Sequence, residues 1–487
     1  MIRTPFTGFR IRTFAALLAA AGFFAPGAPC PVAAAERVFR AGAAKSNITP
    51  PLGLPIIGGW APQPATHIHD ELWARCLVLD NGEARVALVV ADNLGFPREV
   101  ADAARRWIEE ETDISGAHVL IAATHTHSAA SARTPNRLVR QEELTDYQHF
   151  IARRIADGVR CAINNLAPAR IGFGRAELPG EVFNRRWRMD PGDHLRNPFG
   201  GMDRVRMNPP RRHAALIEPA GPTDPEIVFL SLQSAEGQPI ALLANYSLHY
   251  VGGVPRGHIS ADYFGIFAGR IQERLGADRL DPPFVGILSN GTSGDINNIN
   301  FREPGESYPP YGKMREVAER TVQAVLAAHA ELDYHDWVPL GAALDDVVLK
   351  VRRPSEEKLA YLRAVLEKPE GEPAYHSRER TYAERVLLSL EAPDEVAVPV
   401  QALRIGPSGI AALPFEVFVE IGLELKDRSP LKPAFTVSFA NGSYAYLPTP
   451  AQHELGGYET WLGTSLVKEE ASVKLVDRLL EMWEQLK

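Results

Sequence analysis

Cysteine is scarce in this sequence. Only three cysteines stand among 487 residues, and two of them, Cys76 and Cys161, lie beyond the N-terminal forty. A disulfide-stabilised scaffold requires more bridges than two cysteines can form, so a packed hydrophobic core must hold the fold together. Cys76 and Cys161 fall in apolar and helical patterns, where packing is their expected role.

Dense runs of lysine and arginine are also missing. The chain carries 52 Lys and Arg residues against 60 Asp and Glu residues, which gives a formal net charge of −8. Nucleic-acid binding generally depends on a concentrated basic surface. We therefore expect no nucleic-acid partner.

Apolar runs of membrane-spanning length do not occur after the N-terminus. The first residues combine a basic stretch, an apolar run over residues 14–24 and the small residues 33–35 before Glu36. This pattern is typical of a cleavable secretory signal peptide, whereas a spanning helix needs about 20 apolar residues. We expect cleavage after Ala35, a secreted or periplasmic protein without a transmembrane segment, and a single domain over residues 36–487.

Hydrophobic residues make up 45% of the chain and charged residues 23%, which is enough apolar material for a large core. Runs rich in Val, Ile and Leu predict strands at residues 72–79, 86–91, 119–123, 227–232, 240–244, 284–288 and 410–413. Helical periodicity predicts helices at residues 98–111, 144–165, 260–275, 314–332, 355–366, 417–426 and 471–486. This alternation predicts an α/β fold with a mixed β-sheet core flanked by helices.

Two segments stand apart from this pattern. Residues 184–222 show no clear period and are expected to form a long functional loop. Residues 355–395 are charged and helical, which predicts a surface excursion.

A pair of histidines follows one of the predicted strands, in the order Thr124-His125-Thr126-His127. Alternate side chains of an extended chain share a face, so both imidazoles can point at one site past the strand's carboxyl end. A neutral imidazole is a common zinc ligand, but two histidines on a turn can also be hydrogen-bonded structural residues. The motif alone leaves both interpretations open.

Other polar residues follow further predicted strands. They are Asp92, His249, the segment 290–295 and Glu416. Ligand sites of open α/β sheets collect outside the carboxyl ends of strands, which favours one shared site at the strand C-terminal ends. Each residue alone also suits a simpler role as a helix cap or turn residue.

Short motifs in a fixed order run from about residue 41 to residue 465. They occupy residues 41–51, 123–128, 184–185, 245–249, 294–295, 413–416, 441–449 and 457–459. In this order they resemble the catalytic domain of the neutral/alkaline (non-lysosomal) ceramidase family. The resemblance covers nearly the whole chain after the signal peptide.

The resemblance implies a bound zinc ion (Zn²⁺) and a set of residues around it. The implied ligands are His125, His249, Glu416 and Tyr446. The residues implied at the substrate end are His127, Arg185 and Tyr458. A phenol has an ordinary pKa of about 10, so a tyrosine ligand requires that coordination favour the phenolate.

The chain departs from the family pattern at one catalytic position. Asn297 stands where the family has a serine, and an amide cannot act as an alkoxide nucleophile. The chain also ends soon after the tyrosine-rich segment, without the immunoglobulin-like domain of full ceramidases. We therefore expect a ceramide-like or other small-molecule or lipid N-acyl substrate.

These expectations combine into a secreted zinc-dependent hydrolase that cleaves an amide bond by activating water, which needs no serine. His127 is the expected proton shuttle, Tyr458 or Arg185 the oxyanion donor, and Asn297 a group that orients the carbonyl. Supporting roles around the site are expected for Asp92, Asp295, His258 and Asp262.

Two alternatives remain open at this point. An amidohydrolase-type (β/α)8 barrel would also carry an H-x-H motif, on the first of eight strands. A secreted zinc-containing binding protein of the same fold would keep the metal but lack turnover. The sequence leaves the oligomeric state and any second metal ion undetermined.

Overall fold

The computed structural model describes residues 37–59, 61–369 and 371–487. The expected signal peptide, with its cleavage site after Ala35, lies outside these residues. None of the described helices is both long and apolar enough to span a membrane.

The largest sheet has nine strands and combines both pairing directions. Its strands are β1 (Arg40–Asn47), β5 (Trp73–Asp80), β6 (Arg85–Ala91), β7 (Val119–Ala123), β8 (Ala167–Glu177), β13 (Glu226–Ser234), β14 (Pro239–Tyr246), β16 (Val285–Asn290) and β18 (Tyr334–His335). The order is β16-β14-β13-β8-β1-β5-β6-β7, with β18 paired to β8. The pairs β6–β7 and β14–β16 are parallel, while β5–β6 and β13–β14 are antiparallel. This confirms the mixed sheet and excludes the eight-stranded parallel barrel for the described part of the chain.

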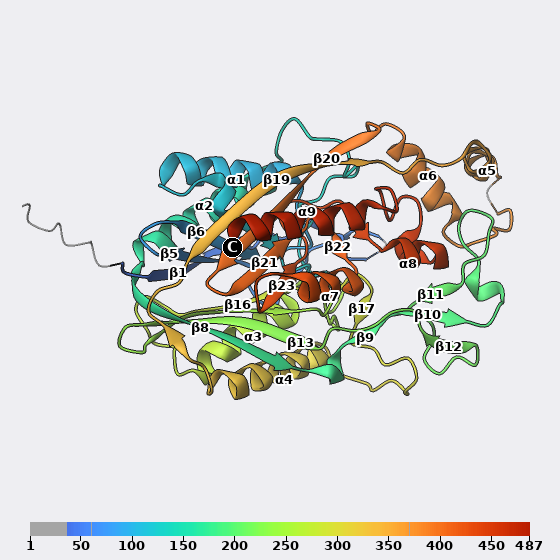
Figure 1. Cartoon of the computed structure of the whole chain (residues 1–487). Helices are drawn as coiled ribbons and strands as arrows, with labels where there is room; N and C mark the ends of the chain where they lie inside the picture. The colour runs from blue at the N-terminus through green and yellow to red at the C-terminus, as the bar shows by residue number, and fades with distance from the viewer. Residues whose placement is uncertain (1–36, 60, 370) are drawn as a thin grey trace, which may run out of the picture. The chain divides into compact units, whose positions relative to one another are not determined.

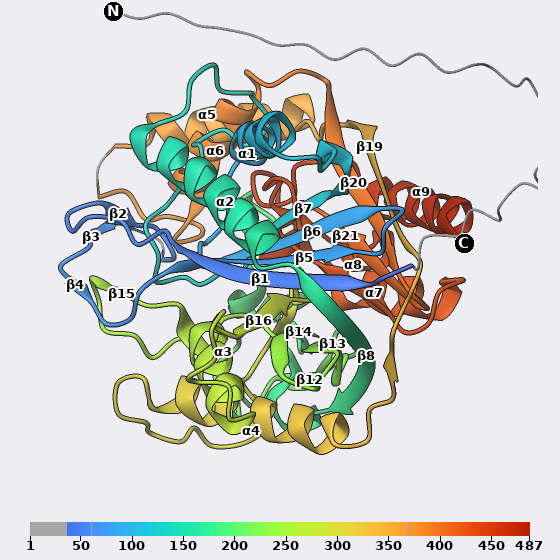
Figure 2. The same ribbon diagram turned by 90° about the vertical axis from the view of Figure 1, so that its left-hand side faces the viewer.

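Helices cover the sheet at both of its ends, as Figure 2 shows. Helix α2 (Asp146–Asn164) lies over β1, β5 and β6, with α1 (Arg98–Glu111) packed beside it. Helix α3 (Asp262–Arg274) lies against β16, and α4 (Gly312–His329) packs on α3 and β8. The start of α2 is fixed by a capping box, in which the Thr145 side chain accepts from the backbone N–H of Gln148 and the Gln148 side chain accepts from that of Thr145.

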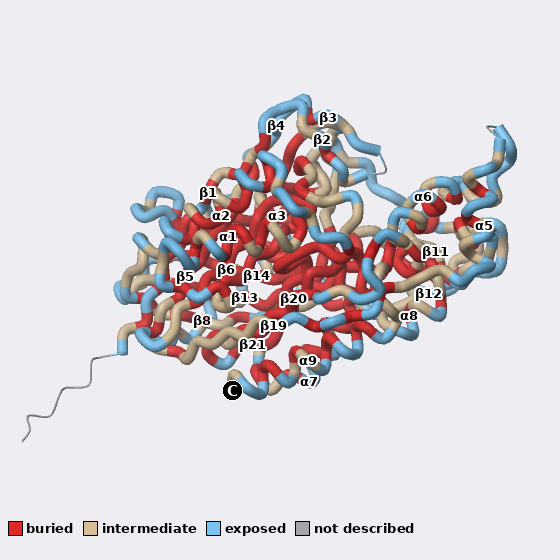
Figure 3. The backbone as a smooth tube through the Cα atoms, turned by 90° about the horizontal axis from the view of Figure 1, so that it is seen from above, coloured by how far each residue is buried: buried red, intermediate tan, exposed pale blue. Residues whose placement is uncertain are grey.

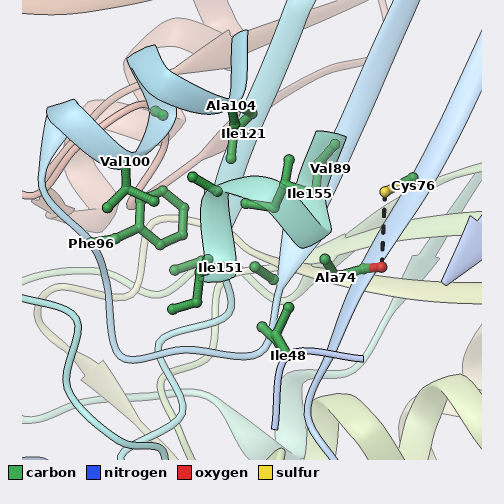
Figure 4. Packing of buried hydrophobic residues seen from close by; sticks show 14 of the residues in the cluster. Ile48, Ala74, Cys76, Val89, Phe96, Val100, Ala104, Ile121, Ile151 and Ile155 are labelled. Atoms are coloured by element: carbon green, nitrogen blue, oxygen red, sulfur yellow. Dashed lines mark hydrogen bonds between the residues drawn. The ribbon is translucent and has the colours of Figure 1, made fainter. Parts of the chain in front are cut away.

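Apolar side chains fill the space between these helices and the sheet. Figure 4 shows Val100 of α1, Ile151 and Ile155 of α2 and Ile121 of β7 in one cluster of buried residues. Cys76 is buried in this cluster, as its apolar context predicts. Cys161, in contrast, is exposed on α2.

A second sheet packs on the first. Its strands are β19 (Leu340–Lys350), β20 (Glu395–Ile405), β21 (Ser408–Ala412) and β23 (Ala434–Val437), in that order. Leu403 and Ile410 of this sheet share a buried cluster with Leu88 and Leu230 of the first. Helices α7 (Val419–Arg428) and α9 (Ala471–Leu486) cover its other face, around the fully buried Trp483 (Figure 1).

The segment expected to be an irregular loop contains a small sheet instead. Strands β10 (Arg186–Met189), β11 (Val205–Met207) and β12 (Leu216–Pro219) form it, in the order β11-β10-β12. The stretches of alternating polar and apolar residues are too short, and the segment is too rich in Arg, Pro and Gly, for the sequence to predict these strands.

The charged helical excursion is present as α5 (Glu356–Glu367) and α6 (Glu379–Ser389), which contact each other (Figure 3). A short helix, α8 (Pro450–Leu455), lies in the C-terminal region. The remaining strands form two-residue pairs: β2 (Pro55–Ile56), β3 (Gln63–Pro64), β4 (His67–Ile68), β9 (Phe183–Asn184), β15 (His258–Ile259), β17 (Ile296–Asn297), β22 (Glu416–Val417) and β24 (Tyr446–Leu447).

Candidate metal centre

Three histidines meet just past the carboxyl ends of β7 and β14. His125 and His127 follow β7, and His249 follows β14. One ligand atom of each lies within 4.8 Å of the others, and His125 and His249 are buried. The ring centroids of His125 and His127 are 4.6 Å apart, and those of His125 and His249 are 4.7 Å apart. These residues could hold a metal ion.

A backbone carbonyl orients each of the three rings through its Nδ1 atom. The carbonyl partners are Leu94 for His125 at 2.7 Å, Gly58 for His127 at 2.6 Å and Ser293 for His249 at 2.9 Å. A carbonyl can only accept, so each Nδ1 carries the proton and each Nε2 presents a lone pair. This orientation by a backbone partner is characteristic of metal-binding histidines.

Two of these lone pairs face each other closely. The Nε2 atoms of His125 and His127 are 3.0 Å apart. Two lone pairs at this distance repel unless a cation or a shared proton lies between them. A metal ion bound between them would satisfy both nitrogens.

Burial keeps the imidazoles in the form that binds metal. Desolvation lowers the pKa of His125, and it lowers the pKa of His127 and His249 well below the ordinary value of 6.5. The neighbouring His125 further lowers the pKa of His127, and Arg185 further lowers that of His249. Neutral rings with free Nε2 lone pairs follow near neutral pH.

The backbone that brings the histidines together differs from the expected extended chain. His125 has φ 68°, in the left-handed region, so simple alternation along a strand is not the reason why its ring meets that of His127. Stacking fixes the two rings instead. The ring centroids of His125 and Phe439 are 3.9 Å apart, and those of His127 and Tyr250 are 3.7 Å apart.

Glu416 joins the cluster from β22, the short strand that follows β21 and pairs with β24. Its Oε2 lies 3.6 Å from the His125 Nε2, and the side chain is almost fully buried. Burial acts to raise the pKa of Glu416, but His125 and Arg133 outweigh burial and hold the pKa well below its ordinary value. The site therefore contains an ionised carboxylate beside the imidazoles.

Gly294 allows the strand that carries Glu416 to approach. A Cβ atom at position 294 would lie 2.6 Å from the carbonyl oxygen of Glu416, too close for any side chain. The Gly294 N–H donates to the carbonyl of Val417 at 2.8 Å. The glycine of the Gly294-Asp295 motif thus leaves the space that the backbone of Glu416 occupies.

Tyr446 pairs with Glu416 across β22 and β24. Arg185 donates from Nη2 to the Tyr446 hydroxyl at 2.9 Å and from Nε to the buried carboxylate of Glu459 at 3.0 Å. Desolvation raises the pKa of Tyr446 well above its ordinary value, although Arg185 acts in the opposite direction. The phenol is therefore neutral unless a further cation lies beside it.

A cavity of about 440 Å³ opens onto this group of residues. His125, His127, Glu416, Tyr446 and Tyr458 all line it. The Tyr458 ring lies edge-on to that of Tyr446, with centroids 5.8 Å apart. A substrate in the cavity would contact these five side chains, whereas His249 and Arg185 do not line it.

Asn297 lies on β17, and its amide is engaged away from the histidines. Its Nδ2 donates to Asn208 Oδ1 at 2.7 Å, and its Oδ1 accepts from the Ile299 N–H at 3.0 Å. A role in orienting substrate remains a prediction.

The four expected supporting residues hold other backbone groups and side chains, and among the described residues none of the four forms a hydrogen bond or ion pair with the three histidines. Asp92 pairs with Arg75, Asp295 accepts from Val419 and Asn184, Asp262 accepts from Val251 and Gly252, and His258 contacts Tyr311. These contacts suit a structural role.

Sequence reasoning missed Arg133, which lies against the cluster. Its Nη2 donates to the carbonyl of Leu94 at 2.8 Å and lies 3.9 Å from Glu416 Oε1. No strand end or spacing signals this residue, because it lies in an irregular segment after the histidine motif.

Comparison with known proteins agrees with this architecture. The family model described as neutral/alkaline non-lysosomal ceramidase, N-terminal, matches residues 39–304, more than half of the chain. A crystal structure of neutral ceramidase from Pseudomonas aeruginosa is similar with a TM-score of 0.68 at 18% identity, covering 93% of this chain and 75% of that chain. A structure described as ceramidase complexed with C2 gives the same TM-score, identity and coverage. From the family match, this chain belongs to the neutral/alkaline non-lysosomal ceramidase family.

Proposed function

We propose that this protein is a secreted zinc-dependent hydrolase that cleaves the amide bond of a ceramide-like or related N-acyl substrate. The observation that carries the proposal is the cluster of three carbonyl-anchored imidazoles with the Glu416 carboxylate beside them. His125, His127 and Glu416 of this cluster also line the cavity. Family membership supports the reaction class.

The donor set fits zinc. His125 and His249 offer imidazole nitrogens, Glu416 a carboxylate, and Tyr446 a phenol whose ionisation requires a cation. Bound zinc lowers the pKa of a water molecule toward about 7 and polarises the scissile carbonyl. Neither cysteine of the described residues belongs to the donor set, because Cys76 is buried in a hydrophobic cluster and Cys161 is exposed on α2.

The side chains around the cavity supply the remaining chemistry. In the proposed reaction, water oxygen adds to the acyl carbon, the C–N bond breaks, and the departing nitrogen takes up a proton. His127 is anchored through Nδ1, so its Nε2 is the atom that would carry a proton between water and the amine. Its closeness to His125 also makes it a candidate ligand, and metal content of a variant separates the two roles.

Tyr458 lines the cavity and is the better candidate for the oxyanion donor. Burial raises the pKa of Tyr458, which keeps the hydroxyl proton available for donation. Arg185 already donates to Tyr446, Gly294 and Glu459, and is better placed to position Tyr446 than to contact substrate.

A non-catalytic metal-containing binding protein remains the second candidate function. Asn297 at the family's serine position favours it, because a mechanism that depends on that serine is lost. Both candidates bind metal, so only turnover distinguishes them.

The test is hydrolysis by purified, metal-replete protein of ceramides, N-acyl amino acids, N-acyl sugars and simple esters, before and after treatment with a chelator. We expect amide cleavage that the chelator abolishes and zinc restores. His125→Ala should lose metal and activity together, whereas His335→Ala, at an exposed histidine on β18, should keep both. If the wild type is inert on the whole panel while Asn297→Ser gains ceramide hydrolysis, the binding-protein function is the better account.

A further inference from the structure

The cavity over the candidate metal centre is lined by more positive than negative side chains. Three arginines, Arg133, Arg137 and Arg385, line it, and Glu416 is the one acidic residue among its described lining residues. The protein as a whole is acidic, with a formal net charge of −8. Three guanidinium groups at one cavity are therefore a local feature that the overall composition does not explain.

Arg133 is held rigidly at the inner end of this group. Its Nη2 donates to the carbonyl of Leu94 at 2.8 Å and lies 3.1 Å from His125 Nδ1. Nη1, on the same guanidinium, donates to no residue that the structure describes. The Nη1 group of Arg133 can therefore donate a hydrogen bond to an acceptor atom of a ligand.

The other two arginines, Arg137 and Arg385, come from two segments that are connected by a hydrogen bond. Arg137 is half-buried and forms no ion pair with a carboxylate among the described residues. Arg385 projects from α6, with its guanidinium 5.3 Å from the Tyr382 ring centroid. Asn136 donates from Nδ2 to the carbonyl of Leu388 at 3.0 Å, which connects the Arg137 segment to α6.

Exposed apolar side chains lie beside these arginines. Ile57 is 39% exposed and Leu388 is 36% exposed, and both line the same cavity. An acyl chain leaving the cavity can pack on such side chains. The cavity thus combines apolar contacts with a cluster of cations, which suits an amphiphile with an anionic head.

We propose that the substrates of this site are N-acyl amino acids, whose carboxylate on the amine side is bound by Arg133, Arg137 and Arg385. This inference rests on the proposed amide hydrolysis and specifies its substrate class. Guanidinium groups bind carboxylates by paired, charge-assisted hydrogen bonds, while the hydroxyl groups of a ceramide head offer no charge to match them.

The reaction is then a hydrolysis without any co-reactant besides water. The acyl carbon gains the water oxygen, the C–N bond breaks, and the two water protons are distributed so that a fatty acid carboxylate and the ammonium form of the amino acid result. The amino acid carboxylate is unchanged and stays with the arginines until release.

The first test compares two substrates that differ only in the charge of the head, N-lauroylglycine and N-lauroylglycinamide. The zinc-replete wild type should show kcat/KM for the carboxylate roughly 10- to 100-fold above that for the amide head, since one charge-assisted hydrogen bond contributes on that scale. In Arg137→Gln and Arg385→Gln this ratio should fall severalfold to tenfold, mainly through KM. The control is Arg140→Gln, an exposed arginine of the same segment that lies outside this cavity and should keep the wild-type ratio.

The second test measures binding to metal-free protein by calorimetry, so that attraction of the carboxylate to zinc cannot contribute. N-lauroylglycine should still bind more tightly than N-lauroylglycinamide, and salt should weaken the difference. If the protein hydrolyses both substrates with equal kcat/KM and the arginine variants leave the ratio unchanged, the substrate class is wrong while the hydrolase function stands. If no amide is hydrolysed at all, the proposed function fails, and calorimetry alone decides whether the site prefers a carboxylate: a preference supports the anionic ligand, and equal affinities overturn it.

Discussion

Glu459 is the residue whose replacement most directly probes how the site is supported. It is fully buried and accepts from Arg185 Nε at 3.0 Å and from Arg186 Nη1 at 2.8 Å. Arg186 is also fully buried, so the carboxylate is shared by two cations that water does not reach. Glu459→Gln keeps the size of the side chain, removes its charge, and turns an amide NH₂ toward one of the guanidiniums.

We expect this substitution to lower the free energy of unfolding by about 3–5 kcal/mol, the range for removing one partner of a buried ion pair. The matched control is Glu273→Gln. Glu273 pairs with Arg270 at 2.6 Å, but the two side chains are 57% and 52% exposed, so its loss should cost below about 1 kcal/mol.

The assay is urea unfolding of the metal-free proteins, followed by tryptophan fluorescence. Zinc affinity of Glu459→Gln should fall as well, because Arg185 positions the Tyr446 hydroxyl. Equal free energies of unfolding for the two variants would refute the argument that burial, rather than the number of ion pairs, decides their contribution.

Three further predictions concern the centre and its surroundings. His249→Ala should lose most of its bound metal, whereas His127→Ala should keep the metal and lose about 10²- to 10⁴-fold in turnover if His127 moves a proton; elemental analysis that finds His127→Ala metal-free would make it a ligand instead. Gly294→Ala places a Cβ atom 2.6 Å from the Glu416 carbonyl, so we expect a loss of about 1–3 kcal/mol in stability and a smaller thermal shift on adding zinc; an unchanged shift would contradict this. Burial raises the pKa of Asp295 from 3.8 to about 7, so the folded state holds this proton more tightly than the unfolded state does. The protonated Asp295 therefore adds to the free energy of unfolding in full below about pH 4, and this contribution is lost as the pH rises through 7. Asp295→Asn should flatten the pH dependence of urea unfolding over this interval, and a profile parallel to the wild type would count against the raised pKa.

Much of the fold follows from periodicity in the sequence. The predicted helix over residues 98–111 and the predicted strand over residues 119–123 agree with α1 and β7 at both ends. Their apolar residues recur at clear helical spacing or form one continuous buried run. A helix buried on one side and a strand buried on both sides can thus each be predicted from the pattern of apolar residues.

The second sheet was harder to recognise. Only β21 was predicted among its strands, because β19 carries adjacent charges at Asp345 and Asp346 and is half-exposed along much of its length. Strand β20 contains Pro399, a residue that ordinarily argues against a strand with partners on both sides. Pairing with long neighbouring strands overrides these local signals.

Several side chains named from the sequence lie together in the structure, but the sequence did not indicate how they are held. Strand ends pointed to the histidines and to Glu416, and the family resemblance added Tyr446. The carbonyl of Gly58 that orients His127 comes from 69 residues earlier in the chain, and no local pattern could connect them. Arg133, Arg137 and Arg385 were missed for the same reason, since only the folded chain brings α6 to the cavity.

The most direct test of this account is a zinc titration of chelator-treated protein, with hydrolysis of an N-acyl amide as the readout. We predict no turnover without metal and a linear rise that ends at one zinc per chain, as a single centre formed by His125, His249 and Glu416 requires. Full turnover by the metal-free protein, or no turnover at any zinc concentration on any N-acyl amide, would contradict the account.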